Sequence, residues 1–431
     1  EQKGMSRPVY KKDIAYMALR PYVDYFTRNS YSKTIVRGQE NIPEDGAVIL
    51  APNHCNALMD ALVILRAFKD STVFGARADI FRRPSVAKIM NFLKILPMVR
   101  MRDGLHNVIK NKKTTEDIIE VLDNGMRFCM FCEGTHRTMR SLLPVGKGIF
   151  RIAIAAAKRF GDSKPVYVVP VGLEYGDYYR YRSTSIISYG KPINVTDFLK
   201  TSEGLNETDI YRNLREILKE RISGLITYIK DDRYYESKWT LTKAASASST
   251  TDPEELLESN QRNIGSLESL FAGSPESAAV ISEKAESFEK RRTDAKVSYF
   301  SFGHESPGRE TAFRTLAAAA GLPYFIWCAI MCLPMWAIAE YLCRYRIKDK
   351  AFHNTARFGT RLVLSPIMAA IWAAVFFCTL PWQYATLLLL ITLGSFSRFY
   401  EYKNFARILI SDYRLLADKK LQDQYKELKE L

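Results

Sequence analysis

The sequence predicts an α/β domain whose central sheet is covered by helices on both faces, followed by a helical linker and C-terminal membrane helices. Two observations lead to this prediction. Short, continuously apolar segments alternate with amphipathic segments over the first half of the chain, which is typical of a sheet buried on both faces. Near the other end, two long stretches contain no charged residue at all.

At 431 residues the chain is too long for one ordinary domain. We expect four regions: residues 1–30 as N-terminal amphipathic, interfacial helices, residues 31–236 as the α/β domain, residues 237–310 as a polar helical linker, and residues 311–431 as membrane-embedded helices with a basic C-terminal tail. Residues 1–12 lack an apolar core segment, which predicts no cleavable signal peptide.

The N-terminal segment 8–29 is amphipathic at helical spacing. Its apolar positions include Ile14, Met17 and Phe26, and basic residues lie between them. A helix of this kind can lie on a membrane surface with its apolar face among the lipid headgroups. It can equally cap the domain that follows, and the sequence leaves both interpretations open.

The α/β domain reads as alternating elements bounded by Gly, Pro and Asn. We expect strands at 34–38, 47–51, 71–76, 95–101, 127–131, 165–173 and 185–189, and helices at 60–67, 84–93, 114–124, 149–159 and 207–229. In the linker, we expect helices at 256–270 and 278–290, separated by a break at 272–275.

The C-terminal region contains the uncharged stretches 317–338 and 362–397. The first is long enough to cross a bilayer once. The second is too long for one span, and a turn at 379–383 divides it into two shorter helices, with Trp382 at the interface. The basic loop 344–361 between the stretches predicts a cytoplasmic position for that loop.

The net charge of the chain limits the classes of molecule that it is expected to bind. The chain carries 62 basic and 47 acidic residues, a net charge of +15, and residues 1–240 alone account for +12. An excess of this size indicates nucleic acid, a phosphorylated substrate or an anionic membrane surface. Because no nucleic-acid-binding motif is present, we expect no nucleic acid partner. Seven scattered cysteines indicate a reducing compartment.

The strongest candidate for chemistry follows the apolar strand 47–51. His54 and Asp60 lie six positions apart at the end of that strand, and such a pair can act as a general base with its orienting acid. A plain turn between a strand and a helix, with an incidental histidine, is the alternative interpretation of the same residues.

Three further groups follow predicted strands, where ligands of open α/β sheets usually bind. The first holds Arg100 and Arg102, whose guanidinium groups suit a phosphate. The second is the run Glu133, Gly134, Thr135, His136 and Arg137, and the third is the strand end 169–171. A solvated strand edge and a tight turn are the structural alternatives for the first two groups.

We expect no metal site, although Cys129 and Cys132 form a Cys-x-x-Cys pair with His54, Cys55 and His136 as further candidate ligands. A zinc site needs both thiolates on one side of a turn. Here the two cysteines lie three positions apart on a predicted strand, so their side chains point to opposite faces.

Taken together, the four blocks resemble the ordered motifs of the glycerolipid acyltransferase superfamily, the glycerol-3-phosphate and 1-acylglycerol-3-phosphate acyltransferases. His54 and Asp60 match the first block, 97–100 the second, 131–135 the third and 169–171 the fourth. The spacing His-x-Asn-x-x-x-Asp is similar to one branch of the superfamily. The chain departs from the usual pattern at Cys132, which replaces a proline, and at His136, which replaces an arginine.

The resemblance implies a mixed central sheet for the catalytic domain, and a transfer of a fatty acyl group from acyl-CoA or acyl-carrier protein to a hydroxyl of glycerol-3-phosphate or lysophosphatidate. His54 would be the general base and Asp60 its partner. Arg100 or Arg102 would bind the acceptor's phosphate with Lys147 or Arg137. Glu133, Gly134 and Thr135 would organise the acceptor's polar end.

By the same resemblance the enzyme works in phospholipid biosynthesis at a lipid membrane, needs no cofactor beyond its acyl donor, and keeps its catalytic domain on the cytoplasmic side. A single crossing by residues 317–338 would place the basic loop 344–361 on the opposite side from that domain, unless Pro323 and Pro334 bend the stretch into a re-entrant segment. A membrane scaffold without catalytic activity, or a basic anion-binding protein, is the alternative. The presence of His54, Asp60 and Glu133 together argues against a scaffold.

Overall fold

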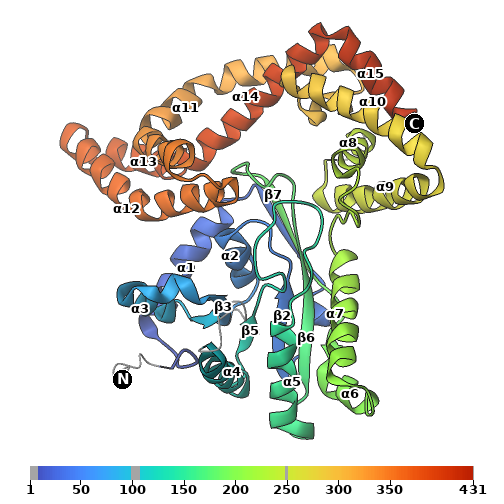
Figure 1. The fold of residues 1–431 in the computed structure, drawn as a ribbon. Coiled ribbons are helices and arrows are strands. Elements are labelled where there is room, and N and C mark those ends of the chain that lie inside the picture. Colours follow the sequence, from blue (N-terminus) through green and yellow to red (C-terminus); the bar gives the residue numbers. More distant parts are fainter. Residues whose placement is uncertain (1–7, 99–106, 248–250, 431) are drawn as a thin grey trace. The chain divides into compact units, whose positions relative to one another are not determined.

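The computed structural model describes residues 8–98, 107–247 and 251–430 (Figure 1). The chain forms two compact units. The first contains the residues up to Arg28, Thr34–Tyr178 and Ser185–Ile226. The second contains Asn29–Lys33, Tyr179–Thr184 and Thr227–Leu431, so two short segments from the first half of the chain belong with its C-terminal helices.

The first unit is built on a mixed sheet. Among the described residues, eight strands form this sheet in the order β1-β7-β6-β2-β5-β3-β4, with β8 pairing β6. The strands are β1 Lys33–Arg37, β2 Ala47–Pro52, β3 Thr72–Arg77, β4 Ile95–Met98, β5 Arg127–Cys129, β6 Val166–Tyr175, β7 Thr184–Tyr189 and β8 Ile193–Asn194. The expectation of an α/β fold with a mixed sheet is confirmed.

Strands β2 to β6 run parallel, and their carboxyl ends therefore meet at one edge of the sheet. β2 pairs in parallel with both β5 and β6, and β3 pairs in parallel with β4 and β5. β7 and β8 run antiparallel to β6. Every residue of β2 is buried, which explains why its sequence is apolar without alternation.

Helices pack on this sheet. They are α1 Ile14–Arg28, α2 Leu58–Arg66, α3 Pro84–Phe92, α4 Asn107–Asp123, α5 Gly148–Phe160, α6 Val195–Thr201 and α7 Glu207–Ser223. α5 and α7 contact β6, and α4 contacts β5. The local sequence explains where several of these helices begin. α3 begins at a proline, and the side chains of Asn194 and Asn206 cap the N-termini of α6 and α7.

The predicted elements of the first unit are observed with differences at their ends, whereas β8 and α6 were not predicted. The last helix of the first unit stops at Ser223 rather than 229, and β5 is two residues shorter than predicted. The last residues of the strand predicted at 95–101 lie outside the described part of the chain. One close approach lies at Gly172 in β6, where a Cβ would lie 2.5 Å from the Cβ of Leu225.

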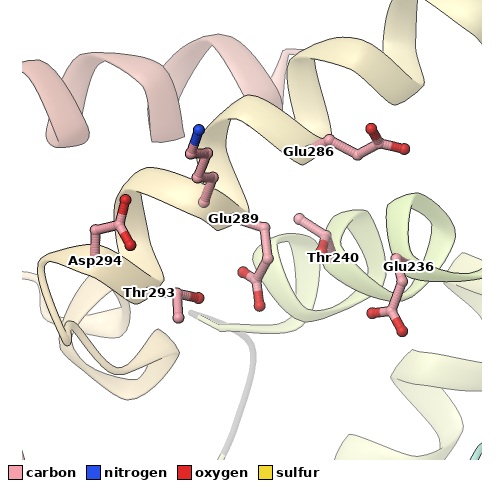
Figure 2. A pocket seen from close by; sticks show the side chains of 7 residues that line it. Glu236, Thr240, Glu286, Glu289, Thr293 and Asp294 are labelled. Atoms are coloured by element: carbon pink, nitrogen blue, oxygen red, sulfur yellow. The ribbon is translucent and has the colours of Figure 1, made fainter.

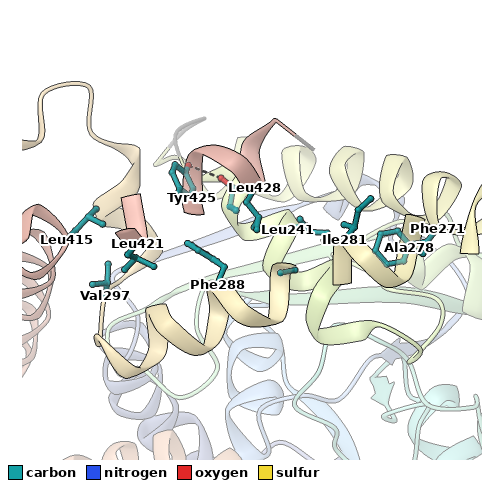
Figure 3. Packing of buried hydrophobic residues seen from close by; sticks show 12 residues of the cluster. Leu241, Phe271, Ala278, Ile281, Phe288, Val297, Leu415, Leu421, Tyr425 and Leu428 are labelled. Carbon is teal, nitrogen blue, oxygen red and sulfur yellow. Dashed lines mark hydrogen bonds between the residues drawn. The ribbon is translucent and has the colours of Figure 1, made fainter. Parts of the chain in front are cut away.

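The second unit is helical. Its helices are α8 Tyr235–Ser246, α9 Pro253–Gly273, α10 Pro275–Asp294, α11 Pro307–Tyr341, α12 His353–Thr379, α13 Trp382–Leu393, α14 Ser395–Ala417 and α15 Lys419–Lys429. Figure 3 shows the core shared by α8, α9, α10, α14 and α15, in which Phe288 is fully buried. The hydroxyl of Tyr425 donates to the carbonyl of Ala244 there at 3.0 Å.

Within the described residues, two helical segments are long and apolar enough to cross a membrane, Pro307–Arg346 and Lys350–Thr379. α11 continues as one helix through Pro323 and Pro334. α12 ends at Thr379 and α13 begins at Trp382, which is the turn predicted from the sequence. Many large apolar side chains of α11 to α13 are exposed.

A cavity of about 290 Å³ lies between α8 and α10 (Figure 2). Its lining is mainly acidic and consists of Glu236, Thr240, Glu286, Glu289, Lys290, Thr293 and Asp294. Glu289 is occupied by internal partners, because Arg292 and Tyr299 both donate to its carboxylate. None of the residues predicted for the active site lines this cavity.

Candidate active site

The site begins where β2 leaves the sheet. Asn53 directly follows β2, and its side chain pairs with the backbone of Leu173 in β6. The Asn53 Nδ2 donates to the carbonyl of Leu173 at 3.1 Å, and the Leu173 N–H donates to Asn53 Oδ1 at 2.7 Å. This amide extends the β2–β6 ladder by one position and fixes the direction in which the chain turns out of the sheet.

The structure brings His54 and Asp60 together. His54 Nδ1 lies 2.8 Å from Asp60 Oδ2. The imidazole stacks on the ring of Phe131 with centroids 4.0 Å apart, and His136 meets its edge at 5.7 Å. The His54 side chain is 18% exposed, whereas that of Asp60 is fully buried. Because Nδ1 is engaged, Nε2 is the ring nitrogen that a substrate can reach.

Asp60 is held from several directions. Its Oδ2 also accepts the N–H groups of Cys55 at 2.8 Å and Asn56 at 2.7 Å. Its Oδ1 accepts the hydroxyl of Tyr175 at 2.7 Å. Donors on both oxygens compensate for the burial of a carboxylate and lock its orientation. An acid fixed in this way can orient a histidine and stabilise its protonated form.

The spacing of five residues between His54 and Asp60 is accommodated by the backbone of Ala57. This alanine has φ 47° and ψ −128°, a conformation that favours glycine, and it directly precedes α2. The turn allows both Cys55 and Asn56 to direct their N–H groups at Asp60. The spacing between His54 and Asp60 therefore has a visible structural consequence.

Glu133 holds the backbone of the same site. Its Oε1 accepts the N–H of His54 at 2.9 Å, and its Oε2 accepts the N–H of Leu143 at 2.8 Å. Burial raises the pKa of the Glu133 carboxyl, whereas these two hydrogen bonds act in the opposite direction. Glu133 thus ties the loop after β5 to the loop after β2, and both of its oxygens are used in doing so.

The rest of the third block surrounds this connection. Gly134 has φ +66°, which suits glycine, and Gly134 and Thr135 are exposed. The Arg137 N–H donates to the carbonyl of His54 at 2.9 Å. Lys147 is exposed just before α5, with its Nζ 5.9 Å from the ring centroid of Tyr211. Arg100 and Arg102 lie outside the described residues, so their predicted contact with phosphate stays a prediction.

Two residues that contribute to the site, Tyr175 and Arg140, were not identified from the sequence. Tyr175 ends β6, beyond the predicted strand, and nothing in its neighbours indicates that its hydroxyl reaches Asp60. Arg140 is buried, forms an ion pair with Glu174 and donates to the carbonyl of Tyr175 at 2.8 Å. In the sequence, only its position shortly after the third block distinguishes Arg140 from other arginines.

The cysteines of the region are buried. Burial raises the pKa of the thiols of Cys55, Cys129 and Cys132, which are protonated at neutral pH and therefore poor nucleophiles and poor metal ligands. In the part of the chain that the structure describes, no group of three or more His, Cys, Asp or Glu side chains is placed to hold a metal ion.

Comparison with known proteins shows what part of this chain resembles. The family model Acyltransferase matches residues 33–174. A solved structure, the 1-acyl-sn-glycerophosphate (LPA) acyltransferase PlsC from Thermotoga maritima, matches with 22% identity and a TM-score of 0.35, over 49% of this chain and 81% of that chain. No curated protein matches the chain significantly. The segment matched by the Acyltransferase model contains His54, Asp60 and Glu133.

Proposed function

We propose that the chain transfers a fatty acyl group from acyl-CoA or acyl-carrier protein to a hydroxyl of glycerol-3-phosphate or lysophosphatidate, with His54 as general base. The observation that carries the proposal is the 2.8 Å contact between His54 Nδ1 and the buried Asp60 carboxylate. It leaves Nε2 of a partly exposed imidazole for an incoming hydroxyl.

In this mechanism the acceptor's hydroxyl oxygen attacks the carbonyl carbon of the thioester while its proton passes to His54 Nε2. The C–S bond then breaks, the His54 imidazolium returns this proton to the departing sulfur, and the donor leaves as a thiol. Asp60 keeps Nδ1 protonated and stabilises the imidazolium that forms during attack. General base catalysis of this kind contributes about 10²–10⁴-fold, and positioning of both substrates supplies much of the rest.

Transfer needs no nucleophile on the enzyme. The thiol of Cys55, whose Sγ lies 3.8 Å from Asp60 Oδ1, is buried, and its pKa is raised by burial and by Asp60. This favours direct attack by the acceptor over an acyl-enzyme intermediate. The proposal also requires no cofactor other than the acyl donor.

A membrane location completes the proposal. The acyl donor carries a fatty acyl chain and the product is a lipid, and the exposed apolar surfaces of α11 and α12 suit a bilayer. The catalytic domain would lie on the cytoplasmic side, where the acyl donors are. Labelling of a Lys348→Cys variant from either side of sealed vesicles tests this orientation.

The central experiment reconstitutes the full chain in vesicles and offers labelled acyl donor with each of the two acceptors. The wild type is expected to acylate one acceptor preferentially, and His54→Ala to lose at least about 10²-fold in kcat. A folded His54→Ala protein that retains full activity would contradict the mechanism. We expect Arg100→Ala to raise mainly the KM of the acceptor. If Arg102→Ala does so instead, the phosphate contact lies two residues later.

A further inference from the structure

The loop between α11 and α12 is compact, and hydrogen bonds within it set its shape. The Ile347 N–H donates to the carbonyl of Leu342 at 2.9 Å, and a ring nitrogen of His353 lies 3.2 Å from the carbonyl of Ile347. Asp349, the single acidic residue of 342–352, accepts the N–H of Ala351 at 2.9 Å. The loop therefore has a defined outer surface.

That surface is cationic. Arg344, Arg346, Lys348 and Lys350 are all exposed, and none of the four forms an ion pair with another described residue. The next cations along the chain behave differently. Arg357 pairs with Glu340 at 3.0 Å, and Arg361 is buried and donates to the Tyr181 hydroxyl. Within the basic stretch, Arg357 and Arg361 therefore have partners inside the protein, whereas the four cations of the loop face solvent.

Exposed aromatic rings accompany the four cations. Tyr341 is 54% exposed and Tyr345 is 67% exposed, with ring centroids 5.4 Å apart. Tyrosine rings next to the ends of apolar helices are typical of the headgroup region of a bilayer. The loop directly joins the two helical segments that are long and apolar enough to span a membrane.

We propose that the loop 342–352 is a binding surface for the headgroups of acidic phospholipids. The four cations would meet lipid phosphates, and Tyr341 and Tyr345 would lie at the level of the headgroups. Clusters of basic residues directly beside membrane helices bind anionic lipids because the surface potential attracts them within about one Debye length. The inference rests on the membrane location proposed above, but not on the catalytic mechanism.

The test places a fluorophore on the loop of the full chain. Cys378 is exposed, whereas the other six cysteines are buried. A Tyr345→Cys, Cys378→Ser protein, which keeps all four cations, is labelled with an environment-sensitive dye and reconstituted in vesicles of phosphatidylcholine alone or with about 30% phosphatidylglycerol. Acrylamide, a neutral quencher, reports access from water. We expect quenching to fall at least about twofold in the anionic vesicles, and the difference to disappear in about 1 M salt, which shortens the Debye length to about 3 Å.

Two charge variants sharpen the result. Replacing Arg344, Arg346, Lys348 and Lys350 with Gln in the labelled protein should abolish the effect of anionic lipid. The matched control replaces Lys419, Lys420, Lys426 and Lys429 of α15, four exposed lysines, and should keep it. Inorganic phosphate added to the neutral vesicles should not reproduce the protection, since the loop is proposed to bind a lipid surface rather than free phosphate.

Equal quenching in both kinds of vesicle would overturn the proposal, as would protection that survives the four substitutions in the loop. Protection by free phosphate in neutral vesicles would overturn it in favour of a soluble anion site. Failure of the wild type to enter vesicles at all would refute the membrane location and this proposal together. If His54→Ala loses acyl transfer but keeps the protection by anionic lipid, lipid binding by the loop is independent of catalysis.

Discussion

The hydroxyl of Tyr175 donates to Asp60 Oδ1 at 2.7 Å, while the other oxygen of the same carboxylate faces His54. Tyr175 is the last residue of β6, and Asp60 lies in the first turn of α2. The end of one parallel strand thereby supports the acid that follows the neighbouring strand. This hydrogen bond makes the position of Asp60 depend on the sheet itself.

We expect Tyr175→Phe to lower kcat by about 10- to 100-fold with little change in the KM of either substrate. The variant removes one hydrogen bond to a buried carboxylate, and such bonds contribute about 1.5–3 kcal/mol, which corresponds to that range in rate. Steady-state kinetics of the reconstituted enzyme measures the effect. Tyr189→Phe is the matched control, because Tyr189 is equally buried and its hydroxyl has no hydrogen-bond partner among the described residues. Equal losses in both variants would show that Tyr175 acts only through packing.

A second prediction separates two roles for Glu133. Both of its oxygens accept backbone N–H groups, so Glu133→Gln can keep only one of the two hydrogen bonds. We expect kcat to fall and the free energy of unfolding to drop by about 1–3 kcal/mol, because one buried donor loses its partner. The acceptor's KM should stay nearly constant. A large rise in that KM with unchanged kcat would instead support the acceptor-binding role implied by the family resemblance.

The sequence predicted the strands of the first unit well because each is apolar on both faces, as β2 illustrates. It also predicted the residues that could form a catalytic pair, since His54 and Asp60 lie beside one strand end. It could not predict the partners of Asp60 and Glu133. The Tyr175 hydroxyl comes from a distant strand and depends on strand order, whereas the Leu143 N–H lies ten residues after Glu133 and depends on the geometry of the loop between them.

In the second unit, too, some features of the helices follow from the local sequence and others depend on packing. The turn before Trp382 follows from local composition, because Pro381 cannot continue a helix easily. The continuity of α11 through Pro323 and Pro334 does not follow from local composition, because proline removes a hydrogen bond within a helix. Packing of α11 against α12 and α14 compensates for that loss, and a sequence alone does not contain this packing.

A third prediction concerns acid stability of the helical unit. Partial burial alone would raise the pKa of Glu289, but hydrogen bonds from Arg292 and Tyr299 and the charge of Lys243 lower it from 4.5 to about 2. A carboxyl with a depressed pKa stabilises the folded state fully above its unfolded pKa and loses that contribution as the pH falls toward the folded value. We therefore expect stability on the order of 2–3 kcal/mol to be lost between about pH 4.5 and pH 2.

Hydrogen exchange of the α10 amides in the full chain measures this loss. Glu289→Gln should be less stable than the wild type at neutral pH, and the difference should shrink steadily as the pH approaches 2. Glu283→Gln is the control, because Glu283 lies exposed on the same helix and should leave the pH dependence unchanged. A constant difference between wild type and Glu289→Gln across this pH range would contradict the assignment.

The last prediction concerns Ala57, whose φ of 47° connects the His54 turn to α2. A glycine adopts this conformation without strain, whereas a β-branched residue does not. Ala57→Gly loses a small buried methyl group but relieves strain of about 1–3 kcal/mol, so its stability should equal or exceed that of the wild type. Ala57→Val should destabilise the protein and lower kcat by displacing Asp60 from His54. Ala153, which is also buried but lies inside α5, is the control. Ala153→Gly should lower the free energy of unfolding by about 1 kcal/mol or more, the opposite of the effect expected for Ala57→Gly. If Ala57→Gly is as destabilising as Ala153→Gly, the turn is not strained, and the spacing between His54 and Asp60 must be accommodated elsewhere.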